Sequence, residues 1–235
     1  TEGYEACRKL LKQRYNSDFA VITSGTTEAI NLAAHAWGEH NLCSGDVVVL
    51  TEMEHHSDIV PWQMLAERIA IELRFVPVDD GKLDLEAFEV ALDGAKLVCV
   101  VHTSNVLGIR NPVEDIVSMS KAVGAKVLID AAQAVPHELI DFKQLGADFM
   151  AFSAHKMCGP TGIGALLISE AAFSEMEPFM GGGDMIETVT LESSTWNEVP
   201  YKFEAGTPNY VQAIGLGTAV DYLSNIGMEN VQAHE

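Results

Sequence analysis

The chain has 235 residues, 48% of them hydrophobic, which is enough to bury a core as one large domain or two small ones and excludes a disordered protein. Its 14 basic residues face 34 acidic ones, and this net charge of −20 argues against nucleic acid as a partner. No apolar run approaches the roughly 18 residues of a membrane span. The four cysteines lack CxxC spacing, so we expect reduced thiols in the cytoplasm, with neither disulfides nor a metal site.

Short runs rich in Val, Ile, Leu and Phe alternate with helical patterns along the chain. The runs predict buried strands at 20–23, 47–50, 73–78, 97–102, 126–130 and 148–152. The helical patterns between them predict helices at 27–37, 57–70, 84–92 and 112–123. This alternation is typical of an α/β fold, here with a mainly parallel sheet of about seven strands flanked by helices.

The pattern changes after residue 152. A glycine-rich turn at 159–164 leads directly into an apolar run at 165–168, too soon for a crossover helix, so we expect this strand to be antiparallel to its predecessor. The stretch 178–210, which contains the glycines 181–183, predicts an extended, loop-rich excursion. Its glycines fit a linker or a loop that approaches a ligand or partner chain. A helical pattern returns at 211.

Candidate site residues are the polar side chains that follow the strands, since ligands of an open parallel sheet bind at the carboxyl ends of its strands. Ser24, Gly25, Thr26 and Thr27 follow the first strand and could cradle a phosphate, although they could equally be an ordinary helix cap. After the second strand, His55 could stack on a planar ring or move a proton.

Three more strand ends carry reactive or polar groups. Asn105 follows the fourth strand and can bind a ligand or build a turn. Asp130 closes an apolar run and therefore needs a cationic partner. Lys156 lies between a strand and a glycine turn, where partial desolvation favours a Schiff base, although most such lysines are simply solvated. The combined set meets the needs of pyridoxal phosphate (PLP), and an unspecified nucleotide-binding domain stays equally open.

Six segments carry a more specific signal. They are SGTTEAINL from Ser24, EHHSDIVPW from Glu54, HTSNVLG from His102, DAAQAVPH from Asp130, FSAHKMCGPTGIG from Phe152 and FEAGTPN from Phe203. In this order they resemble the SUF-type cysteine desulfurases and selenocysteine lyases, which are class V aminotransferase relatives with the fold type I of PLP enzymes. The resemblance implies that residues 1–235 are the PLP-binding large domain, with 178–210 as a dimer-contact excursion.

The resemblance also implies a role for each site residue. Lys156 would bind the cofactor covalently and act as acid and base at the substrate Cα, and His55 would stack on the ring and assist proton transfer. Asp130 would pair with the pyridine nitrogen, Gln133 would hydrogen-bond the phenolic oxygen, and Asn105 would lie near the ring. The residues implied as phosphate ligands are Thr26 or Thr27, Ser153, His155 and, from the neighbouring subunit of a homodimer, Thr207.

The activity implied is release of sulfur from L-cysteine, which leaves L-alanine and an enzyme persulfide that supplies iron-sulfur cluster assembly through a sulfur-acceptor protein. L-selenocysteine is an alternative substrate, and another class V PLP activity is an alternative reaction. The family's persulfide cysteine and carboxylate-binding arginine belong to a C-terminal small domain, which we expect this chain to lack together with the N-terminal segment. A non-catalytic PLP-binding or dimerisation module therefore stays open, and we expect all four cysteines, Cys158 included, to be packing residues.

Overall fold

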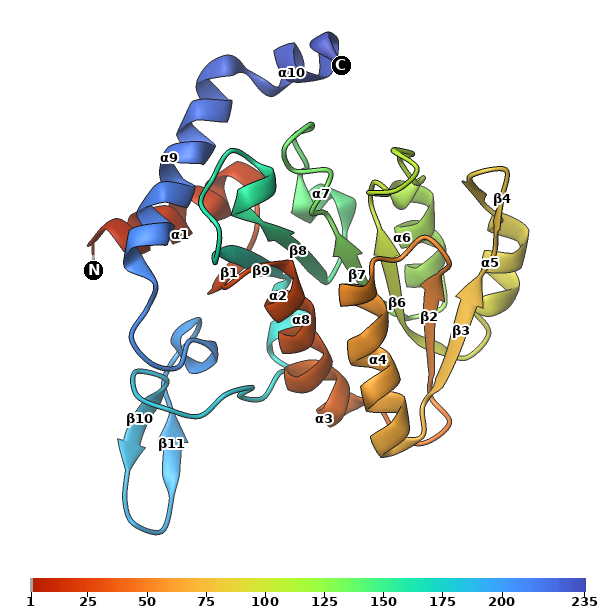
Figure 1. Ribbon diagram of the computed structural model, residues 1–235. Helices are drawn as coiled ribbons and strands as arrows, with labels where there is room; N and C mark the ends of the chain where they lie inside the picture. Colours follow the sequence, from red (N-terminus) through yellow and green to blue (C-terminus); the bar gives the residue numbers. More distant parts are fainter. Residues whose placement is uncertain (1) are drawn as a thin grey trace.

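A computed structural model describes residues 2–235 and places a seven-stranded sheet at the centre of the molecule (Figure 1). Its strands are β1 (Phe19–Thr23), β2 (Val47–Thr51), β3 (Glu72–Val76), β6 (Ala95–Val101), β7 (Lys126–Asp130), β8 (Phe149–Ser153) and β9 (Gly164–Ile168). They lie in the order β1-β9-β8-β7-β6-β2-β3. The predicted α/β fold with about seven strands is confirmed.

Helices cover both faces of the sheet and build two apolar cores (Figure 1). The core of one face includes residues of α1 (Glu2–Tyr15), α5 (Leu85–Ala91), α6 (Val113–Ala122), α7 (Phe142–Leu145), α9 (Tyr210–Ile226) and α10 (Met228–His234). The core of the other face includes residues of α2 (Thr26–Leu32), the π-helical turn Ala33–Gly38, α4 (His56–Ile69) and α8 (Glu170–Phe173). The turn leads into α3 (Glu39–Asn41). The central strands are buried on both faces, which explains their continuous apolar runs.

Strand direction gathers the site residues at one edge. Strands β3, β2, β6, β7 and β8 are parallel, whereas β9 is antiparallel to both β8 and β1. The antiparallel strand predicted at 165–168 is therefore confirmed. Because β1 and β8 both oppose β9, they run the same way, and the carboxyl ends of β1, β2, β6, β7 and β8 meet at the same edge.

Several boundaries differ from the sequence-based expectation. The strand predicted at 73–78 ends at Val76, since Pro77 has no N–H for the ladder. The helix predicted at 27–37 continues through the π-helical turn to Asn41. The stretch 178–210 is not all loop, because β10 (Ile186–Val189) and β11 (Ser194–Trp196) form a hairpin that projects away from the body (Figure 1). The remaining short pair is β4 (Val78–Asp79) and β5 (Lys82–Leu83).

Two of the cysteine expectations are wrong. Cys7 and Cys99 are buried, but Cys43 and Cys158 are exposed. Cys158 lies in a turn with a left-handed backbone (φ 64°), which directs its side chain away from the core that we expected it to fill. None of the helices among residues 2–235 has the length and apolar character to cross a bilayer.

Candidate active site

The turn after β1 meets the end of β8 directly. The backbone N–H of Thr26 donates to Ser153 Oγ at 2.8 Å, and the hydroxyls of the two residues lie 2.7 Å apart. Both side chains are buried. The first turn of α2 therefore presents backbone N–H groups and two hydroxyls at one point of the carboxyl edge, which is a suitable arrangement for an anion.

Glycine makes this close approach feasible. A Cβ on Gly164, at the start of β9, would lie 2.3 Å from the carbonyl oxygen of Phe152 and 2.7 Å from Cα of Gly25. A Cβ on Gly25 would lie 3.1 Å from Ser153 Oγ. The backbones of β1, β8 and β9 thus converge with no room for a side chain, which fixes the cradle built by Thr26 and Ser153.

His55 is held by the first turn of α4. Its Nδ1 accepts a hydrogen bond from Ser57 N at 3.1 Å and lies 3.0 Å from Ser57 Oγ. The Ser57 hydroxyl in turn lies 2.8 Å from Thr27 Oγ1, which connects the starts of α4 and α2. Because Nδ1 accepts the Ser57 N–H, the neutral ring carries its proton on Nε2, and the exposed imidazole offers an N–H donor toward the site.

Lys156 and His55 act electrostatically on Asp130. Asp130 ends β7, is 3% exposed, and accepts a hydrogen bond from Ala132 N at 2.9 Å. Burial raises the pKa of Asp130, while the Ala132 N–H and the positive charges of Lys156 and His55 oppose the rise. Lys156 is half-buried in the short helical turn Ala154–Lys156 that follows β8. A carboxylate, an amine and an imidazole therefore share one edge of the sheet.

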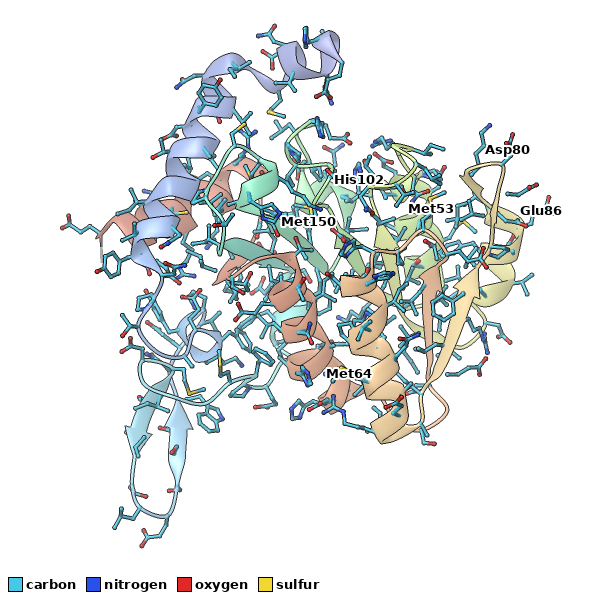
Figure 2. All side chains as sticks on the ribbon, viewed as in Figure 1. Met53, Met64, Asp80, Glu86, His102 and Met150 are labelled. Atoms are coloured by element: carbon cyan, nitrogen blue, oxygen red, sulfur yellow. The ribbon has the colours of Figure 1, made fainter. Side chains whose placement is uncertain are left out.

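Asn105 and Gln133 lie beside this group. They line a common pocket of about 390 Å³, and Asn105 also lines a pocket of about 430 Å³ with His55 and His56. Met53 lines the second of these pockets. Figure 2 shows Met53 and His102 at the upper edge of the sheet and Met64 lower in the view, on α4.

The other two predicted phosphate ligands, His155 and Thr207, are exposed side chains. His155 is exposed and makes no side-chain hydrogen bond to any of residues 2–235. Thr207 is exposed too, and it lines a small pocket of about 160 Å³ with Ser24 and Glu28 of its own chain. The structure thus brings Thr26, Ser153, Asp130, Lys156 and His55 to one edge, and His155 lies in the same turn as Lys156.

Two buried acids, Glu54 and Asp58, and the partly buried Glu204 escaped the sequence analysis. Glu54 and Asp58 lie behind His55, and Glu204 fastens the chain before α9 to α1 and β1. An acid inside a stretch that is otherwise buried is the signal for such residues. Glu54 and Asp58 lie next to the two histidines and Glu204 lies within a loop, and solvated acids are common at such places, so no sequence pattern singles them out.

Comparison with known proteins places this geometry in a family. The model of the family described as aminotransferase class-V matches residues 1–235. A cysteine desulfurase from Haloferax volcanii is 53% identical over 217 residues, which are 92% of this chain and 51% of that protein. The chain therefore spans about half the length of this curated relative.

Solved structures agree with the sequence relatives. The apo cysteine desulfurase from Thermococcus onnurineus NA1 is 44% identical, with a TM-score of 0.94 over 97% of this chain and 58% of that one. A C-DES variant with glycine covalently linked to its PLP cofactor is 26% identical, with a TM-score of 0.89 over 99% of this chain and 63% of that one. Because the family model matches the chain from end to end, this chain belongs to the aminotransferase class-V family.

Proposed function

We propose that this chain is the PLP-binding part of a cysteine desulfurase that removes sulfur from L-cysteine and leaves L-alanine. The observation that carries the proposal is the joint placement of the Thr26–Ser153 cradle and the Asp130, Lys156 and His55 group at one sheet edge. The names of the relatives, and the PLP linked to the C-DES neighbour, support it.

The residues present fit PLP. The Thr26–Ser153 cradle offers hydroxyl groups to a phosphate at the start of α2, and a side chain in place of Gly164 would fill the space that forms it. Asp130 is a buried carboxylate that forms no ion pair with residues 2–235, so it suits a cationic ring nitrogen. Lys156 supplies the amine that a Schiff base with an aldehyde requires.

The residues of the site then have distinct tasks. PLP, when bound, withdraws electrons from the substrate Cα and so weakens the bonds around the carbon that carries the sulfur-bearing group. Asp130, oriented by the Ala132 N–H, would hold the proton on the ring nitrogen, and Gln133 would donate to the phenolic oxygen. Lys156 Nζ would hold the cofactor and move a proton at the substrate Cα. His55, oriented by Ser57, would stack on the ring with its Nε2–H available.

The wider assembly is part of the proposal. We propose residues 1–235 as the large domain and a cytoplasmic homodimer as the working form. In that dimer, Thr207 would reach the neighbour's phosphate and 178–210 would contact the neighbouring subunit, with a sulfur-acceptor protein as the later partner. L-selenocysteine is the alternative substrate, and another class V PLP reaction is the alternative activity.

The experiment mixes the purified chain with PLP and L-cysteine and measures visible absorbance, sulfide and alanine. We expect a yellow complex, which Lys156→Ala abolishes after dialysis. Lys143→Ala is the matched control, since Lys143 is an exposed lysine that pairs with Asp18 away from the site. Binding without sulfur release would assign this chain the role of a non-catalytic cofactor-binding or dimerisation module, and failure to bind PLP would refute the proposal.

A further inference from the structure

Two acidic side chains, Glu54 and Asp58, lie beneath the candidate site without a basic partner. Glu54 stands between β2 and α4 and is 7% exposed, and Asp58, in the first turn of α4, is fully buried. Neither forms an ion pair with a Lys, Arg or His in the described part of the chain. Burial raises the pKa of Glu54 to about 8 and the pKa of Asp58 well above its usual range.

Each of these two carboxyl groups has one oxygen with donors and one without. Glu54 Oε1 accepts from Thr51 Oγ1 at 2.6 Å and from Val101 N at 3.0 Å, and Asp58 Oδ1 accepts from Trp62 Nε1 at 3.0 Å. Glu54 Oε2 and Asp58 Oδ2 are buried and receive no hydrogen bond from an N–H or O–H donor among residues 2–235. A buried charged oxygen without a donor is costly, and protonation of both carboxyl groups, one proton on each, removes that cost.

The two carboxyl groups also affect each other's ionisation. A hydrogen bond from a protonated Asp58 to Glu54 would favour ionisation of Glu54 and disfavour ionisation of Asp58. The thiol of Cys99, from β6, also faces the pair, and burial raises its pKa well above its usual range, so it adds no charge of its own. The pair is thus uncharged as long as each of the two carboxyl groups keeps its own proton.

Asp130 is the third buried acid in this layer, and its surroundings differ. It has the Ala132 N–H as a donor and feels the positive charges of Lys156 and His55, which favour its ionised form. Its negative charge in turn disfavours ionisation of both Glu54 and Asp58. Burial raises the pKa of all three carboxyl groups, but only Asp130 has nearby positive charges that oppose this rise.

We propose that Glu54 and Asp58 form a proton-holding carboxyl pair whose neutrality leaves Asp130 as the single buried carboxylate available to a cationic ring in the site. The two residues are positioning residues, because they act through Asp130 and through the β2–α4 turn that carries His55. The proton-holding pair is independent of the proposed function, whereas its role toward a bound ring rests on that function.

The first test measures how the unfolding constant of the cofactor-free chain changes with pH. A carboxyl group that keeps its proton in the native state and loses it on unfolding raises this constant by up to about tenfold per pH unit. For Glu54 the rise extends from its unfolded value of 4.5 to its folded value of about 8, so stability falls as the pH increases through this window. We expect Glu54→Gln and Asp58→Asn each to lose close to one tenfold dependence per pH unit, which is about 30-fold between pH 6 and 7.5, and the double variant to lose both.

Asp84→Asn is the matched control, because it makes the same change in charge at the N-terminus of α5, where the side chain accepts from Glu86 N and Ala87 N. It should keep the pH dependence of the parent chain. If either Glu54→Gln or Asp58→Asn also keeps it, the carboxyl groups are ionised in the native state and the proposal is wrong.

The contact between the two groups has its own test in the double variant. Thr51 and Val101 fix the oxygen of Gln at position 54, and Trp62 fixes the oxygen of Asn at position 58, so the two NH₂ groups would face each other. We therefore expect the double variant to be less stable at pH 7.5 than the sum of the single effects predicts. Additive effects would show that the two groups do not hydrogen-bond each other and would overturn the proposal.

The role toward the ring is tested with PLP and without turnover. In the PLP-loaded chain, the visible absorbance should change with pH near 8 in the parent and in Asp84→Asn, as Glu54 ionises, and this step should be absent in Glu54→Gln. An unchanged titration in Glu54→Gln would refute the positioning role. If no chain binds PLP, the proposed function fails, while the unfolding measurements still decide whether the pair holds a proton.

Discussion

Truncation of the Glu204 side chain should reduce the free energy of unfolding more than truncation at most other positions in the chain. Its Oε1 accepts from Arg8 Nη1 at 2.6 Å and from Ile22 N at 2.7 Å, and its Oε2 accepts from Tyr4 OH and Arg8 Nη2, each at 2.8 Å. Burial alone would lower the pKa of the Arg8 guanidinium, but its hydrogen bonds to Glu204 and Glu5 raise it overall. This carboxylate therefore connects α1, β1 and the segment before α9.

Glu204→Ala would leave the 5% exposed Arg8 with Ala20 O and the half-exposed Glu5 as its remaining acceptors. Removing one partner of a buried ion pair costs about 3–5 kcal/mol. Because Glu5 still offsets part of the charge, we expect a loss of about 3 kcal/mol. Glu204→Gln, which keeps an acceptor for Ile22 N, should cost about half as much.

The assay is urea unfolding of the parent chain and its variants at pH 7. Glu192→Ala is the control, because that exposed side chain makes no hydrogen bond within residues 2–235 and should change stability by less than about 0.5 kcal/mol. Replacing both partners by apolar residues, as in Arg8→Met with Glu204→Leu, should recover part of the loss. A loss below about 1 kcal/mol in Glu204→Ala would refute the reasoning.

Three further predictions concern the site and its edge. Gly164→Ala places a Cβ 2.3 Å from the Phe152 carbonyl oxygen, so we expect a loss of at least about 2 kcal/mol in urea unfolding together with weaker PLP binding; parent-like values in both would contradict the packing argument. Asp130→Asn keeps the acceptor for Ala132 N but removes the charge, and should weaken PLP binding by roughly 10-fold to 100-fold in an absorbance titration, with an unchanged affinity as the contrary result. Burial, followed by the charge of Arg110, lowers the pKa of His102 to about 4, although Glu138 Oε1 lies 3.4 Å from its Nδ1. Stability should therefore fall as the pH drops from 6.5 to 4, by up to about 3 kcal/mol, and His102→Gln should remove this dependence from acid unfolding curves; an equal loss in the variant would exclude His102 as the cause.

The central sheet was predictable because each buried strand is a continuous apolar run. The run Val47–Thr51 has no exposed residue, and β7 has the same character, so both were found within a residue of their ends. The β10–β11 hairpin was missed because it has no buried face, and its residues therefore show no alternation. The π-helical turn after Leu32 was also beyond prediction, since its residues have the ordinary spacing of a longer helix.

The site residues likewise include some that sequence patterns select and others that they cannot select. Thr26, Asp130 and Lys156 follow strands, so the rule about carboxyl ends was enough to select them. The contact between Thr26 and Ser153 depends on β9 lying between β1 and β8, which no local pattern encodes. Glu54 and Asp58 required knowledge of burial, because an acid next to two histidines has the same sequence whether it is solvated or enclosed.

The antiparallel strand β9 has a consequence for the order in which the molecule folds. Among the described strands, β1 pairs with β9 alone, in a ladder from Phe19 to Ile168, whereas β2, β3, β6, β7 and β8 pair in a parallel series without either. Closing this long loop is slow relative to local pairing. During synthesis the first strand and the helix behind it must therefore wait for most of the chain, and the anion cradle between Thr26 and Ser153 is completed only when the last sheet strand arrives. Binding of the cofactor would therefore occur only after the sheet has closed, and its rate would measure this last folding step.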